Sequence, residues 1–150
     1  MHGGFEIVLW VLLAVASITD LIWGKIHNLL TFSFLAAGVV VRLFEGGLSA
    51  GGMALYAAAA AFFIFFPLYY FKALAAGDVK LMMAVGAWTD LKFVLHLGLV
   101  SIVVGAAVGV IVKLRQRDFK WGATTMPFAP AFLCAFFILK ISEIKGWHLF

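Results

Sequence analysis

The sequence predicts an all-α integral membrane protein, a single domain over residues 1–150 folded as a bundle of about six transmembrane helices, the fourth of them short. Hydrophobic residues make up 65% of the 150 residues and charged residues only 12%. The mean hydropathy is +1.12. A soluble domain of this size would expose more apolar surface than water tolerates. The chain is also too short for a second domain beside such a bundle, so the lipid bilayer is its expected surroundings.

Six apolar segments follow one another along the chain. They cover residues 5–22, 29–44, 53–71, 79–89, 93–112 and 127–141. Several reach the roughly 17–25 residues that a spanning helix needs, whereas the fourth is short. Glycines at 46, 47, 51 and 52 predict a loop between the second and third segments. The five tryptophans mostly fall near segment ends, as aromatic residues at a membrane interface do.

Composition argues against several other classes. The formal charge of +4 does not indicate nucleic-acid binding, because the basic residues mostly lie in loops beside apolar segments. The single cysteine, Cys134, permits no intrachain disulfide and no cysteine zinc site. His2, His96 and His148 show no ligand spacing. His27 could be a proton partner for Asp20, but we interpret it as a histidine of a surface loop. We therefore expect no metal and no cofactor.

The topology follows from counting crossings. Two segments separate Asp20 from Asp78, so both aspartates face the same side of the membrane whichever way the chain is inserted. That side also holds seven of the eleven basic residues: Lys25, Lys72, Lys80, Lys113, Arg115, Arg117 and Lys120. The positive-inside rule places this side in the cytoplasm. We expect a multi-pass protein of the inner membrane with both termini outside and residues 113–120 inside.

Asp20 and Asp78 are the strongest candidates for chemistry. An ionisable side chain at the edge of a bilayer core is costly and marks a functional site by default, and two adjacent carboxyl groups that share one proton can activate water. Asp20 ends the first segment and Asp78 opens the fourth, so helix dipoles favour the proton on Asp20 and the charge on Asp78. A helix cap, salt bridges to Lys25 or Lys80, or a proton relay are the alternatives.

Three motifs resemble those of the type IV prepilin peptidases, a family of membrane aspartic peptidases with a GxGD motif. Asp20 is followed by residues 26–31, Ile-His-Asn-Leu-Leu-Thr, which are similar to the family's Ile-Pro-Asn element. Residues 75–81, Ala-Ala-Gly-Asp-Val-Lys-Leu, resemble GxGD with its trailing Val-Lys-Leu. Residues 126–131, Met-Pro-Phe-Ala-Pro-Ala, resemble the family's third motif. The resemblance implies two catalytic residues, Asp20 and Asp78, and a supporting set of Asn28, Gly77, Lys80, Pro127 and Pro130.

The chain departs from the family pattern at two motif positions. Ala75 replaces the first glycine of GxGD, which is expected to narrow the backbone freedom beside Asp78. His27 replaces the proline of Ile-Pro-Asn, and the usual basic stretch is reduced to Lys25. Neither change removes a carboxylate, so they bear on efficiency and substrate choice more than on the class of reaction.

The resemblance implies an aspartic endopeptidase that cleaves the leader peptide of type IV prepilins or pilin-like proteins at the cytoplasmic face. Larger members carry paired cysteines and also methylate the new amino terminus. This chain has neither their length nor those cysteines, so it resembles the short members of tight-adherence pilus systems and is expected to lack methyltransferase activity. An archaellin-type substrate remains open, as does the oligomeric state.

Two other classes of function compete with the peptidase. A small proton-coupled carrier would use paired acids as a relay. A catalytically silent homologue would act in pilus or secretion assembly. A neighbouring gene for a short protein with a basic leader and an apolar helix would favour the peptidase.

Overall fold

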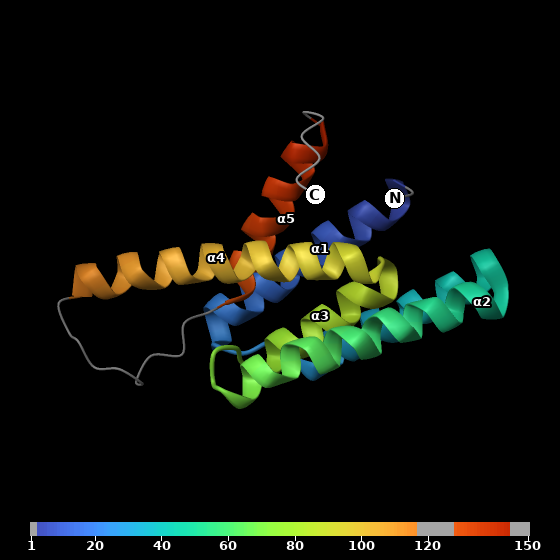
Figure 1. Cartoon of the computed structure of the whole chain (residues 1–150), viewed down its shortest axis with the longest axis horizontal. Helices are drawn as coiled ribbons and strands as arrows, with labels where there is room; N and C mark the ends of the chain where they lie inside the picture. The colour runs from blue at the N-terminus through green and yellow to red at the C-terminus, as the bar shows by residue number, and fades with distance from the viewer. Residues whose placement is uncertain (1–2, 117–127, 145–150) are drawn as a thin grey trace.

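The computed structural model describes residues 3–116 and 128–144, which form five helices and no strand. The helices are α1 (Gly3–Trp23), α2 (Asn28–Tyr70), α3 (Ala76–Trp88), α4 (Leu91–Gln116) and α5 (Ala129–Ile144). Figure 1 shows α3 along the long α2, and α4 crossing in front of α1. The predicted all-α class is confirmed for the described residues.

Helix α2 is interrupted where the glycine pattern predicts a loop. Gly46 (φ −134°, ψ 17°) and Gly47 (φ 66°, ψ −161°) have non-helical backbone angles. The positive φ at Gly47 lies in the region that glycine adopts without steric cost. Leu43 lies against Gly51 across this break. The two arms of α2 therefore correspond to the second and third predicted segments.

Helix α3 packs against both arms of α2. Near its end, a Cβ built on Gly86 would lie 3.0 Å from the carbonyl oxygen of Ala57. The Trp88 indole N–H donates a hydrogen bond of 2.8 Å to the carbonyl of Phe34 in the first arm. Arg42, also in the first arm, donates to the Thr89 carbonyl at 2.8 Å. These contacts fix the end of α3 that lies opposite Asp78.

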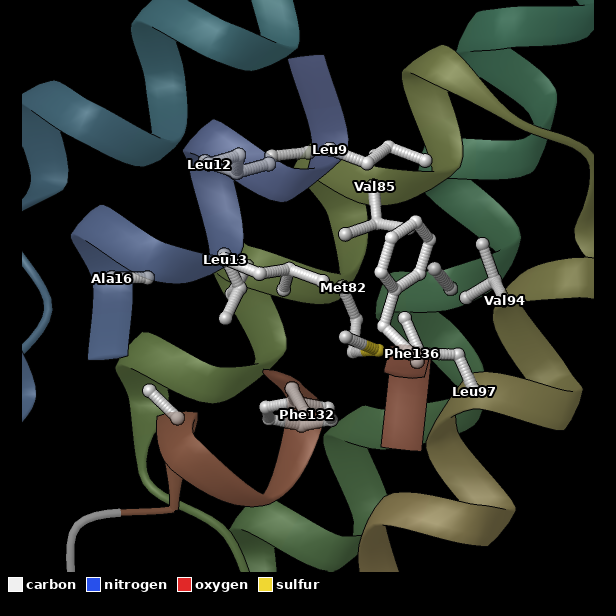
Figure 2. Packing of buried hydrophobic residues seen from close by; sticks show 14 of the residues in the cluster. Leu9, Leu12, Leu13, Ala16, Met82, Val85, Val94, Leu97, Phe132 and Phe136 are labelled. Carbon is white, nitrogen blue, oxygen red and sulfur yellow. The ribbon is translucent and has the colours of Figure 1, made fainter. Parts of the chain in front are cut away.

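One hydrophobic core joins all five helices. Its members include Leu9 and Leu13 of α1, Met82 and Val85 of α3, and Phe136 of α5. Figure 2 shows the Phe136 ring among side chains from α3 and α4. The close packing of these aromatic and aliphatic side chains fixes the helices relative to one another. It therefore also holds the helix ends that carry Asp20 and Asp78.

In the part of the chain that the structure describes, three helices are long and apolar enough to cross a membrane: Gly4–Trp23, Asn28–Tyr70 and Leu91–Ile111. The chain is thus a helical, multi-pass membrane protein. Helix α3 has only 13 residues and is not among the three. Six crossings, including one by the fourth segment, stay a prediction.

Candidate active site

Both aspartates line one open pocket of about 460 Å³. Its walls come from the end of α1, the linker 24–27, the start of α2 and the start of α3. Asp20 is 7% exposed and Asp78 is 2% exposed. The fold therefore brings together two carboxyl groups that lie 58 positions apart in the sequence. It buries both of them at the edge of a polar cavity.

Asp78 is held by the backbone at the start of α3. It occupies the third position of the helix, and its Oδ2 accepts a hydrogen bond of 2.9 Å from the Ala75 N–H. Such a bond satisfies one of the backbone donors that the first turn of a helix leaves free. Asp78 is thus not the N-cap residue itself, which is Ala75, but its side chain closes the first turn of α3 from the third position.

Asp20 is held by a different helix from the one that carries it. Its Oδ2 accepts a hydrogen bond of 3.0 Å from the backbone N–H of Ala129, the first residue of α5. Figure 1 shows the start of α5 beside the C-terminal half of α1. Exposed N–H groups and the dipole at a helix N-terminus favour a negative charge. The sequence placed Asp20 only at the unfavourable end of α1 and missed this contact.

The surroundings of Asp78 raise its pKa. Asp78 precedes the apolar stretch 79–89 and lies outside the three candidate spans. Burial raises the pKa of Asp78 from 3.8 to about 7, the Ala75 N–H opposes this rise, and the charge of Asp20 adds to it. Burial therefore favours the neutral form of Asp78, whereas the dipole of α3 alone would favour its charged form.

Lys80 and Asn28 meet at the rim of the pocket. The Lys80 Nζ donates a hydrogen bond of 2.8 Å to Asn28 Oδ1 and lies 5.6 Å from the centre of the Phe32 ring. Among the described residues, neither Lys80 nor Lys25 forms a salt bridge with a carboxylate. The predicted salt bridges from these lysines to the aspartates are thus not formed. The hydrogen bond instead ties the start of α2 to the start of α3.

Gly77 lets the linker 24–27 pack closely on α3. A Cβ at this position would lie 3.1 Å from the Cβ of Ile26, which is buried. Ala75, in contrast, has φ −81° and ψ 157°, an ordinary extended conformation. The alanine that replaces the first motif glycine therefore imposes no strain on the backbone.

The remaining predicted residues lie at the start of α5 or outside the described residues. Pro130 is half-buried in the first turn of α5, next to the Ala129 N–H that binds Asp20. Pro127 lies outside the described residues. His27 lines the pocket and makes an edge contact of 5.3 Å with Trp23. Its predicted role as a surface histidine agrees with its exposure.

Within residues 3–116 and 128–144, no group of three or more His, Cys, Asp and Glu side chains could hold a metal ion. The chemistry available at the described pocket is that of two carboxyl groups, two lysine ammonium groups, one imidazole, one side-chain amide and backbone N–H groups.

The sequence matches known proteins over most of its length. Residues 7–110 match the model of the type IV leader peptidase family. The chain belongs to this family. It is 34% identical over 131 residues to a prepilin leader peptidase/N-methyltransferase of Burkholderia pseudomallei (strain K96243), covering 83% of this chain and 41% of the relative. No solved structure matches it.

Two further relatives with the same name cover more of the chain. The protein of Aeromonas hydrophila is 31% identical over 149 residues, or 93% of this chain and 50% of the relative. That of Legionella pneumophila is 30% identical over 167 residues, or 99% of this chain and 56% of the relative. The chain thus spans about half the length of the curated relatives that it matches. Membership of this family supports a role as a prepilin peptidase.

Proposed function

We propose that the chain is an aspartic endopeptidase that removes the leader peptide of type IV prepilins or pilin-like proteins, using Asp20 and Asp78 to activate water. The observation that carries this proposal is the shared pocket, in which two carboxyl groups are buried and each accepts a backbone N–H at the start of a different helix. Burial raises the pKa of Asp78 to about 7, so we assign the proton to Asp78 and the role of the carboxylate to Asp20. That combination is what an acid–base pair needs at neutral pH.

The proposed reaction gives each aspartate one role. The Asp20 carboxylate takes a proton from a water molecule, whose oxygen attacks the scissile carbonyl carbon. Protonated Asp78 gives its proton to the carbonyl oxygen, which produces a neutral tetrahedral diol. As the C–N bond breaks, the proton held by Asp20 passes to the leaving nitrogen, while a hydroxyl proton of the diol returns to Asp78. Both carboxyl groups end in their starting states.

The substrate and the side of the membrane are inferred from other observations. The family and the printed names of its relatives support a prepilin or pilin-like substrate. Two arms of α2 separate the two aspartates, which supports a pocket at a single membrane face. The excess of basic residues supports the cytoplasmic face of the inner membrane. The absence of methyltransferase activity stays a prediction.

Reconstitution of the purified chain tests this function. Liposomes containing the chain would be incubated with a purified prepilin in the presence of S-adenosylmethionine, and the products would be weighed by mass spectrometry. We expect release of a leader peptide and a mature product without an added methyl group. An unchanged prepilin at every chain-to-substrate ratio would overturn the peptidase and favour a silent homologue or a carrier. A methylated product would overturn only the prediction about methyltransferase activity.

A further inference from the structure

Helices α1 and α5 are joined by polar contacts at two points. At one point the Ala129 N–H donates to Asp20 in the pocket, at 3.0 Å. At the other, the Lys140 ammonium lies 2.6 Å from the Glu6 carboxylate. The Lys140 side chain is 11% exposed and that of Glu6 is 32% exposed. An ion pair shielded in this way is screened less than a surface pair, so it constrains the two helices more strongly.

The spacing of these contacts sets how the two helices lie along each other. Glu6 and Asp20 are 14 residues apart in α1, which is about 21 Å along the axis. Ala129 and Lys140 are 11 residues apart in α5, which is about 16 Å. The long lysine side chain makes up the difference. A shift of α5 by one residue would break one contact or the other.

Between the two points the helices touch through aromatic rings. Trp10 of α1 packs edge-to-face on Phe136 of α5, with ring centres 4.7 Å apart, and lies 6.1 Å from Phe137. Rings packed in this way prefer particular geometries, and a short ion pair depends strongly on distance. The ring packing and the ion pair therefore both act on the axial position of α5.

We infer that Glu6 and Lys140 form a positioning pair, which sets the position of α5 along α1 so that the Ala129 N–H reaches Asp20. Neither residue lines the pocket. They act through Asp20, by keeping the helix N-terminus that stabilises its charge in place. This inference rests on the proposed function, because its effect on catalysis passes through the carboxylate proposed to activate water.

The chain contains a matched control for this idea. Lys140 also pairs with Glu143 at 2.6 Å, within the same helix. Glu6→Gln removes the pair that joins two helices, and Lys140 keeps Glu143 as a partner, so no buried charge is left unpaired. Glu143→Gln removes an ion pair of the same length between two residues of α5. Lys140→Arg keeps the charge and should preserve the link to Glu6.

The first readout is the kinetics of leader removal in liposomes. Glu6→Gln should lower kcat about tenfold, with KM nearly unchanged, and should move the acidic limb of the pH profile to higher pH. Besides Asp20, the titratable groups that line the pocket are Asp78, Lys25, His27 and Lys80, and none of them is altered by the variants. Glu143→Gln and Lys140→Arg should stay close to wild type. Equal losses in Glu6→Gln and Glu143→Gln, or a loss with an unchanged pH profile, would overturn the inference.

The second readout does not need activity. Spin labels can be attached to the native Cys134 of α5 and to Ile18→Cys of α1, which are both exposed positions. The distance between the two labels is then measured by pulsed electron paramagnetic resonance. Glu6→Gln should broaden or shift this distance, and Glu143→Gln should leave it unchanged. An unchanged distance in Glu6→Gln would overturn the positioning pair. If the wild-type chain does not cleave a prepilin, but Glu6→Gln still changes the distance relative to wild type, the proposed function is overturned and the positioning pair is not.

Discussion

The two aspartates of the pocket differ in what surrounds them. Asp78 is almost fully buried and accepts one hydrogen bond from the Ala75 N–H. Asp20 accepts a hydrogen bond from the first residue of a neighbouring helix. Burial disfavours the charged form of a carboxyl group, and a helix N-terminus favours it. For Asp78 burial is the larger influence, and its pKa is raised.

The raised pKa of Asp78 predicts a dependence of stability on pH. The pKa is about 7 in the folded chain against 3.8 ordinarily, so the stability gained by burying the neutral carboxyl group is complete below about pH 4 and is lost as the pH rises to 7. The Asp78→Asn variant is neutral throughout. Its Tm in detergent should exceed the wild-type Tm by an amount that grows from pH 4 to pH 7, corresponding to at most about 4 kcal/mol. A difference in Tm that stays constant over this range would contradict the burial argument.

The extended backbone of Ala75 predicts the effect of restoring the motif glycine. Because φ is −81° and ψ is 157°, glycine gains nothing in the folded state and adds freedom to the unfolded chain. The cleavage rate of Ala75→Gly should lie within about twofold of the wild-type rate, and its free energy of unfolding should fall by about 0.5–1 kcal/mol. Cleavage rates and Tm values measured side by side would check both parts. Complete loss of cleavage at normal membrane levels would show that the methyl group of Ala75 is itself required.

Much of the site was predictable from the sequence, and one part was not. The motif residues Asp20, Asn28, Gly77, Asp78 and Lys80 all line the pocket. The contact between Asp20 and the Ala129 N–H joins positions 109 residues apart. It is made by a backbone atom, which no side-chain pattern reveals. Burial of Asp78, which raises its pKa, also could not be predicted from the position of this residue at the start of α3.

At the scale of the element, α3 presents Asp78 because it packs closely against α2. Gly86 allows this, since a Cβ there would lie within 3.1 Å of backbone atoms of Ala57 and Ala58. Backbone atoms cannot relieve a close contact by changing rotamer, as a flexible side chain can. The second arm of α2 and the helix that carries Asp78 therefore lie so close that an alanine at position 86 would require a small shift of the backbone.

Substitution of Gly86 should separate these two elements. Gly86→Ala should cost about 1–3 kcal/mol through overpacking and should reduce cleavage, because the shift of α3 moves Asp78. Gly52→Ala is the matched control, since nothing lies within 4 Å of a Cβ at that position in α2. It should keep full cleavage and slightly raise the Tm through its better helix propensity. Equal Tm values for the two variants would show that the approach at Gly86 is not tight.

The helices were predictable to different degrees. The breaks at residues 46–47 and 89–90 follow glycine and polar residues that the sequence displays. The pairing of α3 with both arms of α2 was not predictable. In an apolar chain almost every face of a helix is hydrophobic, so periodicity does not indicate which face meets a neighbour.

At the scale of the whole molecule, the orientation in the membrane is open to a direct test. In a Cys134→Ser background, Arg117→Cys should react only with reagents that reach the cytoplasm, and Glu45→Cys, next to the break in α2, only with periplasmic reagents. The reason is the excess of basic residues on the side of the aspartates. Labelling at position 117 from the periplasm of intact cells would show that the fourth segment does not cross.

The central claim is that Asp20 and Asp78 act as one acid–base pair. The most direct test is leader removal from a prepilin by Asp20→Asn, Asp78→Asn and the double variant, in liposomes with matched protein levels. Asparagine keeps the size and can still accept the Ala75 and Ala129 hydrogen bonds, but it cannot exchange the proton. Each single variant should lose at least about 100-fold in cleavage rate, and the double variant should be no worse, because residues that act as a unit are not additive. Cleavage at a rate close to wild type by either single variant would contradict the claim.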